Sequence, residues 1–146
     1  MLVQRISRTD PERVFIVVRN DQGGTITRGY PVAFNMDGTR NGVDVQLVDT
    51  VADEALLAGI AHTDIADQDY GLAQAYGYDD DAVLVKTNSN LEIGGVLACL
   101  SASSCLQVIS TAQADKVIYA GFASGAEQMT SSSAVTTRAK IFIRLL

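Results

Sequence analysis

Short runs of β-branched and aromatic residues, each ended by turn-forming residues, recur along this chain. Residues 13–19 read RVFIVVR and are followed at once by NDQGG. Val, Ile and Phe favour strands, whereas Gly, Asn and Asp favour tight turns. Short strands with turns every eight to twelve residues or so are typical of a β-barrel or a β-sandwich.

Similar signals predict strands or short extended pieces along the whole chain, at residues 13–19, 31–34, 43–47, 58–61, 72–78, 82–86, 96–100, 106–109, 116–122 and 139–146. Residues that favour the start of a helix occur only between Thr50 and Leu57, where Thr50 can cap one or two helical turns at most. At 146 residues the default is one compact domain. We therefore predict a mainly β, small single-domain β-barrel or β-sandwich with at most one or two short helical turns.

The two ends of the chain differ in character. We predict an extended N-terminal arm over residues 1–12, which reaches a neighbouring subunit, and a β-rich domain over residues 13–146. The arm carries two bases and isolated apolar residues, namely Leu2, Val3, Arg5, Ile6 and Arg8. Simple disorder of the arm is the alternative. At the other end, Ile141, Ile143 and Leu145 alternate with polar or aromatic residues, so the last segment is predicted as a buried closing strand.

Charge is distributed unevenly along the sequence. The net charge is −6, but residues 1–43 carry +2, residues 44–85 carry −10 and residues 86–146 carry +2. An acidic protein is disfavoured as a nucleic-acid partner. The separation of charge suits docking between subunits, and a solvated acidic face is the alternative.

Residues typical of catalysis or metal binding are scarce. His62 is the only histidine, there is no Trp, and Cys99 and Cys105 match no metal or redox spacing. We expect both thiols to be buried. We also expect no catalytic residue, no cofactor and no metal site.

Two weak patterns point toward metal binding or catalysis. Asp64, Asp67 and Asp69 supply carboxylates, but the Gly and Glu positions of an EF-hand loop are not matched. His62 precedes Asp64 by two residues, which resembles part of a general-base pair. No nucleophile can be assigned to it, so a surface or hydrogen-bonded histidine is favoured over a small hydrolase.

No membrane partner is predicted either. The N-terminal residues lack the apolar core of a secretory signal, which indicates synthesis in a cytoplasm. Residues 93–114 are uncharged but contain many Ser, Thr and Gln residues, so a membrane helix is rejected. Tyr70, Tyr76 and Tyr78 cluster around Gly71 and Gly77 and suit either a core edge or a subunit contact.

The segment AGIAHTDIADQDYGLAQAYGY at residues 58–78, followed by VLVKTNSNLEIGGVLAC at residues 83–99, resembles the capsid decoration, or cement, proteins of tailed bacteriophages. The shared features are a Gly-Ile-Ala turn, a Tyr-Gly and Tyr-Gly-Tyr strand, an alternating Val run and a Gly-Gly turn. AGFA at residues 120–123 and RAKIFIRLL at residues 138–146 fit the same scheme. The resemblance covers about the C-terminal two thirds of the chain.

The resemblance implies a non-enzymatic virion protein on the outer capsid surface. Such proteins bridge subunits of the major capsid protein, often as homotrimers at three-fold positions, and stabilise the shell. The implied partners are the major capsid protein and other copies of the chain, without nucleic acid or membrane. The arm residues and the three tyrosines are the candidate partner-binding residues. Another virion part, such as a head-fibre, tail or adsorption module, is the alternative.

Deleting residues 1–12 is expected to weaken both the trimer and its affinity for capsids, because the arm would no longer reach a neighbouring subunit. The measurements are mass in solution and co-sedimentation with capsids. If the truncated chain has the same mass in solution and the same affinity for capsids, residues 1–12 do not act as an arm between subunits.

Overall fold

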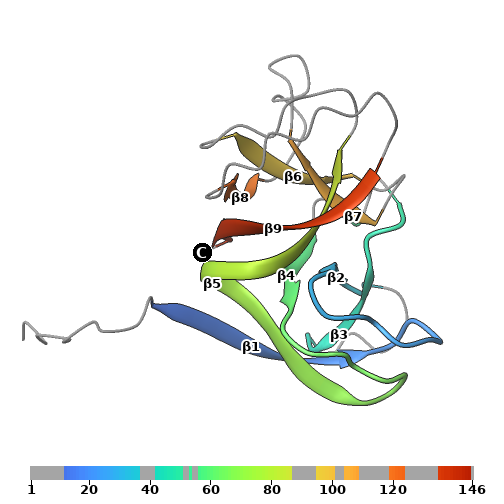
Figure 1. The fold of residues 1–146 in the computed structure, drawn as a ribbon. Helices are drawn as coiled ribbons and strands as arrows, with labels where there is room; N and C mark the ends of the chain where they lie inside the picture. Colours follow the sequence, from blue (N-terminus) through green and yellow to red (C-terminus); the bar gives the residue numbers. More distant parts are fainter. Residues whose placement is uncertain are drawn as a thin grey trace, which may run out of the picture.

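Nine β-strands make up the fold, which a computed structural model describes at residues 12–36, 42–50, 53, 56–86, 95–100, 104–108, 119–123 and 135–145 (Figure 1). The strands are β1 (Arg13–Asn20), β2 (Pro31–Phe34), β3 (Asp44–Leu47), β4 (Leu57–Ala61), β5 (Tyr70–Lys86), β6 (Val96–Leu100), β7 (Cys105–Val108), β8 (Tyr119–Ala123) and β9 (Val135–Arg144). The predictions of a mainly β protein and of a single small domain are both confirmed.

The strand β5 is the longest, at 17 residues. The prediction of two separate strands at residues 72–78 and 82–86 is wrong, since Asp79, Asp80 and Asp81 belong to one continuous strand. The ladder between β5 and β9 instead shifts register between Asp79 and Ala82, and pairing resumes beyond the shift. The three aspartates therefore lie at a bulge, which bends a strand without ending it.

Pairing through β5 organises the strands into two circuits. One circuit runs β1–β3–β2–β4–β5 and returns to β1, and the other runs β5–β7–β6–β8–β9 and returns to β5. Most pairs are antiparallel, but β1 joins β3 in parallel through only two residue pairs, and β5 joins β7 in parallel at Leu84. The described strands thus form two linked circuits, and the single closed barrel among the predicted architectures is not what the chain adopts.

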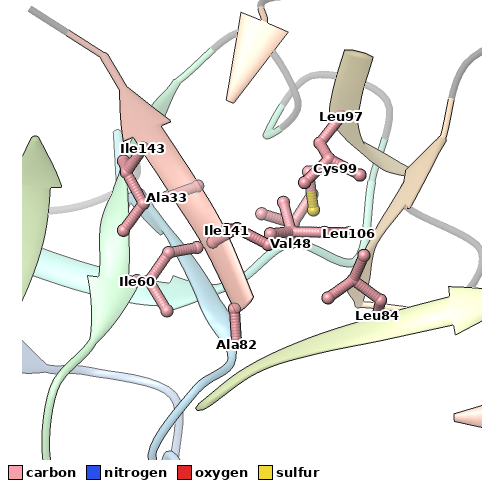
Figure 2. Close-up of a cluster of buried hydrophobic side chains, with 10 residues drawn as sticks. All are labelled: Ala33, Val48, Ile60, Ala82, Leu84, Leu97, Cys99, Leu106, Ile141 and Ile143. Atoms are coloured by element: carbon pink, nitrogen blue, oxygen red, sulfur yellow. The ribbon is translucent and has the colours of Figure 1, made fainter. Parts of the chain in front are cut away.

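Two hydrophobic clusters fill the fold. Within the first circuit, Val18, Ile26, Val32 and Ile65 are buried together with residues of β3, β4 and β5. The second cluster lies against β5, β6, β7 and β9, and Figure 2 shows it: Ala33, Val48, Ile60, Ala82, Leu84, Leu97, Cys99, Leu106, Ile141 and Ile143.

The strands β2 and β4 contribute to both clusters. On β2, Val32 faces the first cluster and Ala33 faces the second. On β4, Ala61 faces the first cluster and Ile60 faces the second. Strands buried on both faces read as continuous apolar runs. This explains why PVAF and LAGIA lack the polar alternation of β9.

Several local predictions meet different outcomes. Both cysteines are buried thiols, as predicted. Among the described residues there is no helix beyond the turn around Asp53, where the Leu56 N–H donates to the Asp53 carbonyl over 2.9 Å. The strand β9 starts at Val135, four residues before the start of the strand predicted at residues 139–146. Residues 1–11 of the predicted arm lie outside the described residues.

The connection from β1 to β2 is fixed against β4 and β5 at Gly29. The Gly29 N–H donates to the Ala61 carbonyl over 2.8 Å, and the Gly29 carbonyl accepts from the Val83 N–H over 2.9 Å. Gly29 has φ of +87°, and a Cβ atom there would overlap the backbone carbonyl of Asp81. Both the positive φ and the close approach require glycine.

Gly29→Ala is expected to lower the free energy of unfolding by more than about 2 kcal/mol, because backbone strain adds to an overlap that rigid backbone cannot relieve. Gly23→Ala is the matched control, since Gly23 has φ of +81° but nothing within 4 Å of an added Cβ atom. Urea unfolding followed by circular dichroism measures both variants. Equal losses would show that the contact with Asp81 does not constrain the fold.

Candidate functional site: two exposed strand faces

An apolar patch is exposed where β1 pairs with the first half of β5. Val17 is 58% exposed, Tyr70 67% and Leu72 39%. Val17 lies directly opposite Leu72 and Arg19 directly opposite Tyr70, so the four side chains share one face of the ladder. We call Val17, Tyr70 and Leu72 the β1 patch.

Further along the same face of the β1–β5 ladder, beyond the β1 patch, the side chains are more buried. The ring of the half-buried Phe15 lies 4.8 Å from the ring of His62, measured between centroids. Gln74 lies opposite Phe15 and is fully buried. Its amide nitrogen donates to the carbonyls of Tyr76 and Tyr78 at 3.2 and 3.1 Å, which fixes the irregular backbone around Gly77.

A second surface, formed by β5 and β9, combines aromatic and basic side chains. Tyr76 lies opposite Arg144 and Tyr78 opposite Phe142. The rings of Tyr76 and Phe142 meet edge to face, with centroids 5.2 Å apart and planes at 81°. Such a pair holds both rings in place before any partner arrives. We call Tyr76, Tyr78, Lys140, Phe142 and Arg144 the aromatic strip.

The cations of the aromatic strip are available to a partner. Lys140 and Arg144 are exposed, and neither forms an ion pair within the part of the chain that the structure describes. Tyr and Arg are enriched among the residues that contribute most binding energy at protein interfaces. The strip therefore has the composition of a protein-binding surface.

The acidic block at residues 44–85 serves mainly the fold. Asp44 accepts from Arg19 Nε over 2.6 Å and is buried. Arg28 and Arg138 both bind Asp81, at 3.2 and 2.5 Å. Asp64 and Asp67 accept from loop N–H groups, those of Arg28 and Gly23. Much of the −10 charge is therefore paired or hydrogen-bonded inside the molecule.

Asp53 shows how such a carboxylate holds a loop. Burial acts to raise the pKa of Asp53, but hydrogen bonds from the Thr50 hydroxyl and N–H, at 2.7 and 2.9 Å, outweigh it and lower the pKa. The hydrogen bond with Asp53 raises the pKa of its neighbour Asp49. This reciprocal capping by Thr50 and Asp53 is the helix-start chemistry that the sequence predicts.

The structure does not bring His62 and Asp64 together as a general-base pair. Asp64 accepts from the Arg28 N–H over 2.7 Å and makes no bond with His62. His62 Nδ1 is buried and has no hydrogen-bond partner in the described part of the chain. Within those same residues no three His, Cys, Asp or Glu side chains gather as metal ligands, and no helix is long and apolar enough to cross a membrane.

The predicted partner-binding residues fall on separate surfaces. Tyr70 belongs to the β1 patch, whereas Tyr76 and Tyr78 are half-buried in the aromatic strip. The arm residues Leu2, Val3, Arg5, Ile6 and Arg8 lie outside the described residues. The sequence alone does not single out five further members of these surfaces, namely Val17, Leu72, Lys140, Phe142 and Arg144. Alternation in RVFIVVR and AKIFIR signals which side chains share a face, but the sequence does not show which face is covered.

Comparison with known proteins places the fold. No family model matches the chain, and no curated protein matches it. Among solved structures, the crystal structure of the head fibre gp8.5 N base in bacteriophage phi29 is similar, with a TM-score of 0.50 and 12% sequence identity. The match covers 92% of this chain and 96% of that chain. At this identity the likeness shows a shared fold.

Asp44→Asn is expected to lower the free energy of unfolding by about 1.5–3 kcal/mol, the usual loss for a buried hydrogen bond to a charged group. Asp69→Asn removes a charge from the same block at an exposed position whose side chain has no partner in the described residues, and should change stability by less than about 0.5 kcal/mol. Thermal and urea unfolding compare the two. Equal effects would contradict a structural role for the acidic block.

Proposed function

We propose that this chain is a non-enzymatic structural protein of a phage virion, which attaches to the outside of the head by binding the major capsid protein. The observation that carries the proposal is the fold shared with the phi29 head fibre base over 92% of this chain. The sequence resemblance to capsid decoration proteins supports it independently of the structure.

The aromatic strip is the surface that we assign to the capsid protein. Its exposed cations have no acidic partner among the described residues, and its ring pair is already ordered. Aromatic anchors surrounded by charge give affinity at the centre of an interface and orientation at its rim. Bridging of neighbouring capsid subunits follows if the chain binds as a homotrimer, since each copy presents the same strip.

A second candidate function is the base of a head fibre, and the same structural match favours it. Both functions place the chain on the head, but they differ in what else projects from it. Electron microscopy of labelled particles separates them. Even coverage of the shell indicates decoration, an extended fibre at each site indicates a fibre base, and labelling confined to the tail or its vertex contradicts both.

Lys140→Glu combined with Arg144→Glu is expected to weaken binding to undecorated capsids at least about tenfold, a loss of about 1.4 kcal/mol of binding free energy. The reason is that two positive charges that attract the capsid protein become negative charges that repel it. Thr25→Glu, an exposed substitution between β1 and β2, is the control and should bind like the unaltered chain. Co-sedimentation and the temperature of DNA release from capsids are measured.

No binding by the unaltered chain to capsids from its own phage, and no gain in capsid stability, would refute the proposed function. Binding that survives the double reversal would keep the function and move the contact away from the aromatic strip.

A further inference from the structure

The strand β1 has an open edge. One of its edges pairs with β5 from Arg13 to Arg19, but the other meets β3 only at Arg19 and Asn20. No other described strand pairs with residues 13–18 on that second edge. Backbone N–H and C=O groups along such an edge are free to accept a further strand.

The β1 patch adjoins this edge. Val17 is 58% exposed and lies on the edge strand itself, with Leu72 beside it on β5. An exposed hydrophobic edge strand either associates with another chain or is protected by charge, proline or a covering segment. Within β1, residues 14–18 contain neither a charge nor a proline. The edge therefore has the features of a site for an added strand.

The residues just before β1 have the chemistry to occupy the site. Leu2, Val3 and Ile6 supply apolar and β-branched side chains, and Arg5 and Arg8 supply positive charge. The connection leading into Tyr70 is acidic and exposed, and the side chain of Asp69 has no partner among the described residues. Seven extended residues span about 23 Å, enough to cover the six open residues of β1.

The covalent geometry favours a segment from another copy. Pro11 stands between this segment and Glu12, where a tight hairpin back onto β1 would place its turn. A two-residue turn formed by Pro11 and Glu12 would need positive φ at Pro11, which proline does not adopt, so a fold back within one copy would have to use a longer loop. A segment that arrives from a second copy needs no such turn.

We propose that the open edge of β1, together with the β1 patch, binds residues 2–8 of a second copy of this chain as an added strand. Each copy donates one segment and accepts one, so mutual exchange between two copies gives a two-fold dimer, and exchange from each copy to the next gives a ring when the rotation closes. The inference concerns contacts between copies and does not depend on the capsid contact of the aromatic strip.

A pair of complementary variants tests the exchange. A chain lacking residues 1–11 keeps the acceptor edge and loses the donor segment. A Val17→Lys chain keeps the donor and loses the acceptor, because lysine on an edge strand opposes pairing. Mass in solution is measured by light scattering for the unaltered chain, for each variant alone and for an equimolar mixture.

The expected results are an oligomer of the unaltered 15.5 kDa chain, a monomer of each variant alone, and a one-to-one heterodimer in the mixture. Met36→Lys is the matched control, since Met36 is a 44% exposed hydrophobic residue two residues after β2, and this variant should assemble like the unaltered chain. If Val17→Lys fails to melt cooperatively, Leu72→Lys replaces it.

Three outcomes would overturn the inference. An unaltered chain that is monomeric has no such contact, and a truncated chain that assembles normally does not use the segment. Two monomeric variants that fail to form a heterodimer would show that the segment acts within its own copy. Hydrogen exchange at residues 13–18 gives an independent readout, since protection should fall in the truncated chain and return when a peptide of residues 1–11 is added.

Discussion

Hydrogen bonding along both edges of β5 is the interaction on which the rest of the structure depends. The strand pairs with β1 and β4 in its first half and with β7 and β9 in its second, so each circuit closes only through β5. A straight strand could not serve two circuits that enclose different clusters. The positive φ at Gly77 and the bulge at Asp79–Ala82 supply the change of direction.

This arrangement explains the distribution of charge. A bulge leaves backbone N–H groups without ladder partners, and Asp79 accepts one of them from Asp81 over 2.8 Å. Arg28 and Arg138 then approach Asp81 from the β1–β2 connection and from β9. Carboxylates of the acidic block are therefore hydrogen-bonded or ion-paired within the bends and loops of the fold. The two exposed surfaces differ in character, because the β1 patch is apolar and the aromatic strip carries basic side chains.

The sequence predicted strand positions well because strand and turn preferences are local. Residues 31–34 have the same bounds in the prediction and in the structure, and β1 differs by one residue. The continuity of β5 was missed because Asp79–Asp81 has the composition of a turn, and only pairing with β9, more than fifty residues later, keeps it extended. Burial of β2 and β4 on both faces, and exposure of Val17 and Leu72, depend on which strands meet across the fold. Adjacent residues do not carry that information.

Reliance on distant partners also determines the order in which the molecule can be completed during synthesis. The edge of β5 that β9 occupies cannot be paired until residues 135–144 leave the ribosome, although β5 itself is made some fifty residues earlier. Contacts of such long sequence separation form slowly, and an unpaired strand edge is prone to aggregate meanwhile. The yield of folded protein in a host cell should therefore depend on the speed of translation and on chaperones that shield this edge.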